Sequence, residues 1–340
     1  MRAMDKVSRT ISPWIARWLL LIAAMIFTTL IVGGATRLTK SGLSITEWNP
    51  VKGALPPFND IDWQSLFEKY QLSSQYKLLN QGMALADFKI IFWWEWAHRF
   101  LDRLIGAAFA IPFIFFAVTR QLPKWLWPRL LLIFIAGGLE AVVGWFMVAS
   151  GLVDRVSVSQ YFLAAHLTIA TLLFAAVLWT YFGLRRNIAS FAQGTRWLAA
   201  LLLLLIFVQI AAGAFVAGLD AGQGYNTWPL MDGAFIPQGL GTIEPAWRNV
   251  FENALTVQFD HRVLAYVILA LAALNAVIAR NTEAALLFTA VMFQASLGIA
   301  TLLWHVPIAL ALFHQGGALI VLTAALWNLH QKLRGAATSV

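Results

Sequence analysis

The sequence predicts an all-α integral membrane protein with eight transmembrane helices, arranged as two parallel, pseudo-symmetric four-helix bundles. Of its 340 residues, 60% are hydrophobic and only 12% are charged, far from the composition of soluble proteins. Apolar runs of about 17–25 residues, long enough to cross a bilayer as helices, recur along the chain. Such runs exclude a transmembrane barrel, because barrel strands alternate over about 10 residues.

The eight predicted spans follow one another with short connections except in two places. They cover residues 13–33, 92–118, 129–149, 159–182, 197–218, 256–279, 284–303 and 307–329. The first run is longer than the apolar core of a signal peptide, so we expect a retained helix. Long segments follow the first and the fifth spans, and these two segments resemble each other.

The net charge is +8, and the distribution of the basic residues along the chain indicates the membrane topology. Basic residues collect on one side, with only Asp5 and Glu283 as acids there: Arg2, Lys6, Arg9, Arg17, Arg120, Lys124, Arg129, Arg185, Arg186, Arg196, Arg280, Lys332 and Arg334. The positive-inside rule then places both termini in the cytoplasm and both long segments outside a bacterial inner membrane. This distribution excludes a nucleic-acid partner. The chain has no cysteine, which excludes disulfides, iron–sulfur ligation and thiolate chemistry.

The two long segments indicate an internal duplication. Residues 42–57 read GLSITEWNPVKGALPP and residues 222–237 read GQGYNTWPLMDGAFIP, and an offset of 180 positions aligns Trp48 with Trp228 without a gap. The following spans share a His-Arg pair, in WAHRFLDRLIG and FDHRVLAYVIL. Four spans per repeat leave both halves the same way up, as parallel repeats. We therefore expect an N-terminal bundle over 1–185 and a C-terminal bundle over 186–340.

Four histidines carry the chemistry that this duplication predicts: His98, His166, His261 and His314, each within about two turns of the start of an even-numbered span. A single one of them is as consistent with packing as with ligation, but ionisable groups inside a membrane are costly and usually functional. Zinc requires three or four ligands, whereas haem iron requires two axial ligands. Two imidazoles per half therefore favour one bis-histidine haem site in each half.

Neighbouring residues extend the two predicted sites. Gly144 and Gly298, on the third and seventh spans, leave room for a flat ring close to the backbone. Arg99 and Arg262 each follow a predicted ligand histidine and supply cations for haem propionates.

The halves differ in charge close to the predicted ligands. Glu95 precedes His98 by three residues, while Gln258 precedes His261. A carboxylate beside only one site suits proton transfer, although an acid at a helix end also offsets the helix dipole. In the same way, Glu140 in the third span corresponds to Gln294 in the seventh span of the repeat. Glu140 is therefore a second proton-handling candidate. The role of Asp260, which lies beside His261, stays open.

The chain resembles haem A synthase, in the cysteine-free form of alphaproteobacteria and mitochondria. The resemblance rests on TRLTKSGLSITEWNPVKGALPP, EWAHR, DHR and HQGGA, and covers nearly the whole chain. It implies a membrane-bound oxidoreductase that oxidises a ring methyl of haem O to a formyl group, by successive hydroxylations and loss of water, to give haem A for cytochrome oxidase. It also implies that His261 and His314 hold a resident haem b, that His98 and His166 bind the substrate haem, and that Glu95 is catalytic.

The resemblance implies partners as well: haem O as substrate, membrane lipid, haem O synthase and an electron donor. The sequence identifies neither that donor nor the source of the formyl oxygen, and it leaves assembly into a homo-oligomer open. The alternative function is a di-haem b-type membrane cytochrome that relays electrons. We expect the segments that carry Trp48 and Trp228 to lie as lids over the two haem sites.

Overall fold

The computed structural model describes residues 12–153, 155–184 and 196–337, with side chains up to residue 333. Among these residues, eight helices are long and apolar enough to cross a membrane, which confirms the predicted spans. They are α1 (Pro13–Leu38), α4 (Leu85–Val118), α5 (Trp127–Leu152), α6 (Gln160–Leu184), α7 (Arg196–Gly218), α10 (Ala254–Ala279), α11 (Thr282–Leu303) and α12 (Ile308–Ala337). Within those ranges the fold is helical and forms no strand.

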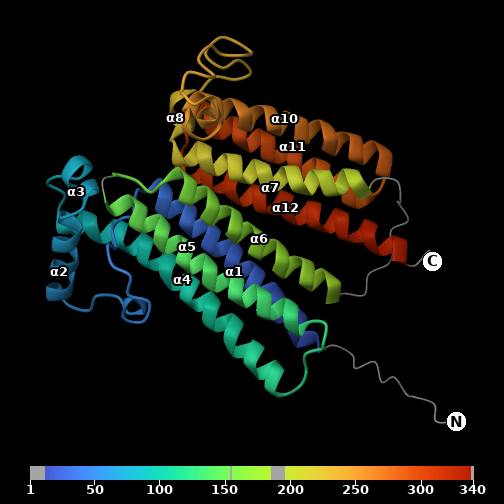
Figure 1. Ribbon diagram of the computed structural model, residues 1–340, viewed down its shortest axis with the longest axis horizontal. Coiled ribbons are helices and arrows are strands. Elements are labelled where there is room, and N and C mark those ends of the chain that lie inside the picture. The colour runs from blue at the N-terminus through green and yellow to red at the C-terminus, as the bar shows by residue number, and fades with distance from the viewer. Residues whose placement is uncertain (1–11, 154, 185–195, 338–340) are drawn as a thin grey trace.

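The membrane helices pack as two groups of four (Figure 1). α1 contacts α4 and α6, and α5 contacts α6; in the other group, α7 contacts α10 and α12, and α11 contacts both α10 and α12. The groups meet where α6 lies against α7 and where α12 lies against α1 and α6. The predicted boundary between the halves, at 185/186, falls outside the described residues.

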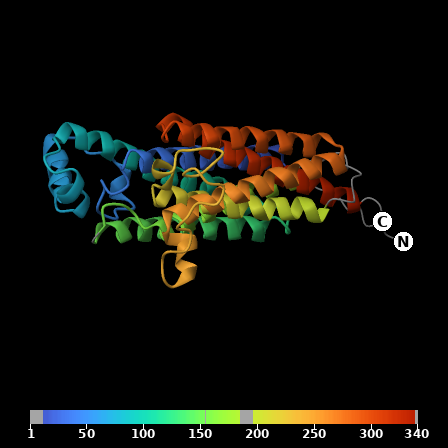
Figure 2. The ribbon, with the colours of Figure 1, turned by 90° about the horizontal axis from the view of Figure 1, so that it is seen from above.

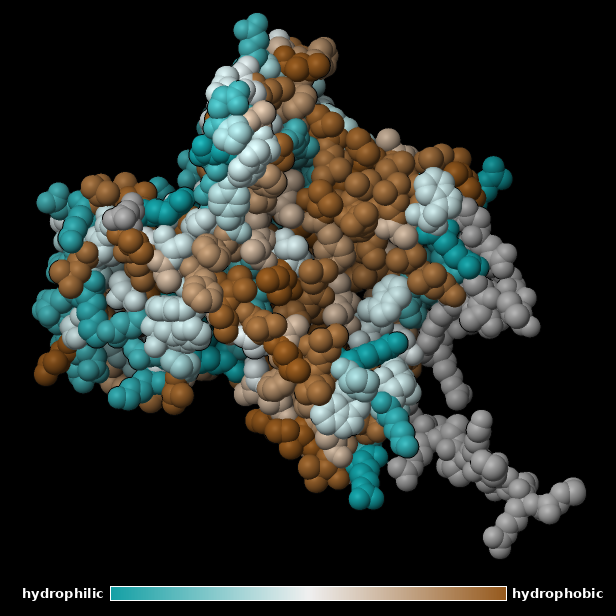
Figure 3. All heavy atoms as spheres, viewed as in Figure 1, coloured by the Kyte–Doolittle hydropathy of each residue, from teal (hydrophilic) through white to brown (hydrophobic). Residues whose placement is uncertain are grey.

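The surface of the helices is apolar because lipid surrounds it. Side chains such as Ile111, Leu132, Leu204 and Phe293 are more than half exposed. The space-filling view shows broad hydrophobic patches over the helices and hydrophilic residues gathered over α2 and α3 at one end (Figure 3). The buried core is formed by residues such as Trp18, whose indole donates to the carbonyl of Ala108.

A small extramembrane unit follows α1. It contains the 3-10 turn η1 (Lys52–Ala54), α2 (Asp60–Gln71) and α3 (Ser74–Leu79), and it projects beyond one end of the bundles (Figures 1 and 2). Trp63, Phe67 and Tyr70 pack against Phe88 and Phe92 of α4. This aromatic packing stabilises additional helical turns, so α4 begins at Leu85 and not at the predicted residue 92.

The matching segment after α7 is built differently, although it shares the repeated sequence. It contains α8 (Ala221–Gly224), η3 (Ala246–Arg248) and α9 (Asn249–Glu252), with a single bridge between Met231 and Ala234. Arg37, at the end of α1, donates to Asp220 at 2.7 Å and to the carbonyl of Ala217. The ion pair joins the two halves at the end of the molecule that carries both segments.

Candidate functional site

Each of the four predicted ligand histidines lies against a glycine of a neighbouring helix. A Cβ added at the glycine would lie 2.9 Å from His98 (Gly33), 2.9 Å from His166 (Gly144), 3.1 Å from His261 (Gly213) and 2.8 Å from His314 (Gly298). The sequence predicted that Gly144 and Gly298 would make room for a flat ring. The rings that occupy this space are the imidazoles themselves. Gly33 and Gly213, which lie against His98 and His261, were not predicted, although their separation of 180 residues in the repeat could have indicated them.

Replacement of these glycines is expected to displace the imidazoles. The Cβ of Gly298→Val meets the Cε1 atom of His314 at 2.8 Å, closer than Cβ atoms approach in folded proteins, so the ring must move. We expect Gly144→Val and Gly298→Val each to lose more than about half of the haem bound at their own site, because overpacking forces side chains off their rotamers. Gly137→Val on α5 is the control, since a Cβ there meets no atom within 4 Å. Pyridine haemochrome assay of the purified proteins measures the content; equal content in all variants would contradict the packing argument.

The histidines come together in pairs from two helices of each half. The ring centres of His98 on α4 and His166 on α6 are 6.4 Å apart. Two imidazoles bound to one iron, with Fe–N bonds of about 2 Å as for other first-row metals, place their ring centres about 6 Å apart. His261 on α10 and His314 on α12 are close enough to interact electrostatically. The spacing of the first pair is therefore compatible with two imidazoles that share one iron.

The donor set fits a group that needs two protein ligands. Over the described ranges, no three His, Asp or Glu side chains converge to hold a bare metal ion. His98 lies thirteen residues into α4 and not within two turns of its start, because α4 extends into the extramembrane unit. Its depth in the bundle is shown by its contacts with Gly33 and His166.

Side chains of adjacent helices orient the imidazoles. The Oε1 atom of Glu140 lies 2.9 Å from Nδ1 of His166, although the ring N–H is not aimed straight at the oxygen. In the other half, Nε2 of Gln294 lies 3.1 Å from Nδ1 of His314 and donates to the carbonyl of His314 at 2.8 Å. Gln209 on α7 lies 3.1 Å from Nδ1 of His261. Glu140, predicted as a proton-handling candidate, is therefore a direct neighbour of a predicted ligand.

Arg99 and Arg262 fasten the two repeated segments to the helices below them. Arg99 donates to Glu95 at 2.5 Å and to the carbonyls of Ile45 and Glu47, both at 2.9 Å. Arg262 donates to Gln258 at 3.0 Å and to the carbonyls of Tyr225 and Thr227, both at 2.8 Å. The four carbonyls occupy matching places of the repeat, since 45 and 47 become 225 and 227 at the offset of 180.

The same clamp holds both copies of the repeated segment. Each segment is attached to the helix turn that follows a predicted ligand. Other contacts differ between the copies: Arg103 donates to the carbonyls of Asn49 and Pro50, whereas the indole of Trp228 donates to Tyr266 at 2.9 Å. Trp48 instead packs against Trp145, with ring centres 5.2 Å apart. Sequence reasoning predicted the segments but not the arginine clamps.

The first segment is also attached to α2. The Nζ atom of Lys69 lies 2.8 Å from Glu47, and this hydrogen bond and the charge of Lys69 lower the pKa of Glu47 below its usual range.

Glu95 and Gln258 occupy matching environments with different charge. Each side chain is 3% exposed, and each accepts a hydrogen bond from the arginine four residues later. The amide of Gln258 also donates to the carbonyls of Ala221 and Tyr225. Burial and the arginine contact are therefore common to both halves, and the carboxylate belongs to the first half alone.

His305 and His330, the two histidines outside the predicted ligand pairs, differ in burial. His305 is exposed in the turn before α12. His330 is buried, at 5% exposed, and packs against Trp179, Phe182 and Trp327. α12 extends to Ala337, beyond the predicted end of the last span at residue 329, so His330 lies on this helix, close to the end of its apolar part.

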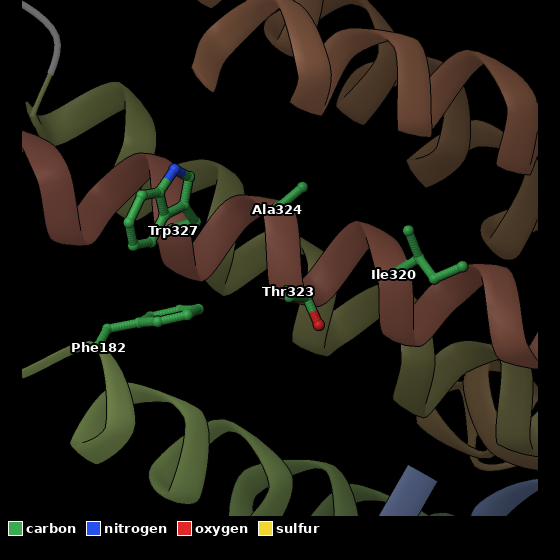
Figure 4. Close-up of a pocket in the computed structure, with 5 residues that line it drawn as sticks. All are labelled: Phe182, Ile320, Thr323, Ala324 and Trp327. Atoms are coloured by element: carbon green, nitrogen blue, oxygen red, sulfur yellow. The ribbon is translucent and has the colours of Figure 1, made fainter. Parts of the chain in front are cut away.

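An apolar groove lies between the two groups of helices. Phe182 of α6 faces Trp327 of α12 across it, and Ile320, Thr323 and Ala324 line the same face of α12 (Figure 4). Its volume is about 420 Å³. None of its lining residues is a predicted ligand, so the groove is separate from the imidazole pairs, and its apolar walls are suited to lipid.

Comparison with known proteins bears on this arrangement. Residues 16–326 match the family described as cytochrome oxidase assembly protein. The curated protein "Heme A synthase" of Parvibaculum lavamentivorans is 52% identical over 322 residues, which cover 93% of this chain and 94% of that protein. The proteins of the same name from Mesorhizobium japonicum and Bradyrhizobium diazoefficiens are also 52% identical, over 92% and 95% of this chain and 89% and 93% of their own lengths.

Proposed function

Because the chain belongs to the cytochrome oxidase assembly family that includes the heme A synthases, it is an oxidoreductase of the membrane that converts haem O into haem A, and we propose that its two halves divide this task. The first four spans bind and oxidise the substrate, and the last four hold a resident haem b. The observation that carries the proposal is the pair of matched imidazole sites, of which only the first has a buried carboxylate at the Glu95 position.

His261 and His314 are the proposed ligands of the haem b. Three features support this fit: two imidazoles from different helices, glycines that leave room for them, and a buried Nε atom of Arg262 that has no acceptor in the structure. That nitrogen is suitably charged for a propionate, while the other guanidinium donors of Arg262 hold the loop. When bound, the haem supplies a one-electron redox centre.

His98 and His166 are the proposed ligands of the substrate haem, with Arg99 beside its propionates. Glu95 is the proposed proton donor and acceptor during the oxidation of the ring methyl to a formyl group, by successive hydroxylations and loss of water. Its side chain is only 3% exposed, so bulk water is kept away from it, which strengthens electrostatic effects at the reacting group. Its bond to Arg99 orients the carboxylate.

The repeated segments are the proposed lids of the two sites. Arg99 and Arg262 connect each segment to the helix turn beside a ligand histidine, so movement of the segment and access to the site are coupled. The partners we propose are haem O synthase, as the source of the substrate, and an electron donor. Neither is needed to build the sites, whose proposed ligands all come from this chain.

A di-haem b-type cytochrome is the function to exclude. Expression of this chain in cells that make haem O but lack their own synthase tests the proposal, with a chromatographic profile of extracted haems as the measurement. The appearance of haem A is the expected result. Haem b bound at two per chain, with all haem O unconverted, would instead identify an electron carrier.

The proposed topology predicts the position of reporters fused to the protein in a bacterial inner membrane. A reporter after Val340, or in the 185–196 connection, should score cytoplasmic, because basic residues resist translocation. A reporter near Asp62 or Gly239 should score periplasmic, because these residues lie in the two long segments. A cytoplasmic score for Asp62 would place both haem sites on the opposite face of the membrane.

A further inference from the structure

The two halves hold one of their histidines in the same way but with different chemistry. Glu140 on α5 and Gln294 on α11 each lie four residues before the glycine that receives an imidazole, and each reaches Nδ1 of that imidazole on the next helix. The contact distances are 2.9 Å for His166 and 3.1 Å for His314. Both neighbours therefore occupy the same place in the repeat and lie close to Nδ1, but they differ in charge and in hydrogen bonding.

A carboxylate and an amide act differently on an imidazole. A carboxylate oxygen accepts hydrogen bonds, so Glu140 favours a proton on Nδ1 of His166, which would leave the lone pair of Nε2 for a metal. An anionic acceptor also makes the imidazole a stronger donor to iron. Gln294 is neutral, and its Nε2 is held by the carbonyl of His314 at 2.8 Å, so it cannot strengthen His314 in the same way.

The remaining charges near the pairs add to this contrast. Asp102 lies 3.9 Å from Nε2 of His98, and its counterpart in the second half is Ala265. Glu95 has the neutral counterpart Gln258, whereas Arg99 and Arg262 are present in both halves.

At two other positions the difference in charge is opposite, with an acid in the second half or a base in the first. Asp260 stands opposite Ala97, and Arg103 opposite Tyr266. Arg103 directs its donors to the loop carbonyls of Asn49 and Pro50. Among these groups, Glu140 is the acid in direct contact with a proposed ligand.

We propose that Glu140 is a positioning residue that strengthens His166 as an axial ligand, and that it keeps a haem bound by His98 and His166 at a lower reduction potential than the haem bound by His261 and His314. The inference rests on the proposed haem sites. It assigns the first site as the one whose haem is more readily oxidised. It also gives a reason why the first half has Glu140 where the second half has Gln294. A lower potential stabilises the ferric state in the half that we assign to the substrate.

Potentiometric titration of the purified protein tests this inference, with haem b added as the probe until both sites are filled. Absorption spectra follow reduction, and electron paramagnetic resonance reports the axial field of each low-spin ferric haem. In Glu140→Gln the lower of the two midpoint potentials should rise towards the higher one. The affinity of the first site for haem b should fall about 10-fold, as is typical when a metal-binding histidine loses the carboxylate beside its other ring nitrogen. Glu140→Asp should restore part of the difference.

The reciprocal variant makes the test independent of the first site. Gln294→Glu should lower the potential of the resident haem b, whose ligands are unchanged. Glu283→Gln, a change of one acid in the first turn of α11, is the control and should shift neither potential.

Two results separate the inference from the function. Unchanged potentials in Gln294→Glu, or in Glu140→Gln with both haems bound, would overturn the inference and leave the proposed function intact. Failure of the wild-type protein to bind haem through His98 and His166, with Gln294→Glu shifting the resident haem as expected, would instead contradict the proposed substrate site.

Discussion

Glu95→Gln is expected to reduce the formation of haem A at least about tenfold, the lower end of the contribution of a general acid or base being about 100-fold, and to leave the haem b of the second half in place. The structure makes the substitution conservative. Gln258 occupies the matching position and accepts a hydrogen bond from Arg262 at 3.0 Å, so a glutamine at position 95 can accept from Arg99 in the same way. What the variant removes is the ability to exchange a proton.

The measurement is a chromatographic haem profile of membranes from cells without their own synthase. Haem O, or its hydroxylated intermediate, should accumulate as haem A falls. The reciprocal variant Gln258→Glu is the matched control, and it should not create a second active site, because the second half is proposed to hold a resident haem b. A wild-type level of haem A in Glu95→Gln would mean that the carboxylate serves only to fasten Arg99 and the first segment.

His261→Ala and His314→Ala are each expected to remove most of the bound haem b while the protein still inserts into the membrane. Each variant deletes one of two proposed axial ligands and leaves a cavity that water or a weaker ligand must fill. Insertion depends on the apolar length of α10 and α12, which the change does not alter.

Pyridine haemochrome assay of the purified variants checks this loss. His305→Ala is the control, since His305 is exposed in the turn before α12 and touches neither pair; it should keep the wild-type content. Full retention of haem b in both ligand variants would refute the assignment of the resident site.

The positions of the membrane helices could be predicted from the sequence, because a helix that crosses a bilayer needs a continuous run of apolar residues. Each of the eight predicted runs corresponds to one membrane helix. The errors occur where protein packing overrides that rule. α4 begins at Leu85 because Phe88 packs in the aromatic cluster of α2, and α12 continues to Ala337, past the predicted end of the last span at residue 329.

The four histidines could be singled out from the sequence, whereas most of the contacts around them could not. Internal repetition singled out the four histidines without any coordinates. It did not show that Glu140 reaches His166 or that Gln209 reaches His261, because the rotation of neighbouring helices decides such contacts. Nor did it show the clamps, since Arg99 and Arg262 bind backbone carbonyls and carbonyls leave no trace in a sequence. The 180-residue offset between Ile45 and Tyr225 was the available signal.

The haem composition of the purified wild-type protein tests most directly the claim that one half holds a haem while the other converts one. The protein should be isolated from cells that make haem O, and its pigments extracted, separated by chromatography and counted per chain. The account predicts about one haem b per chain, together with haem O and haem A in the first site. Two haem b per chain, with neither haem O nor haem A, would contradict it.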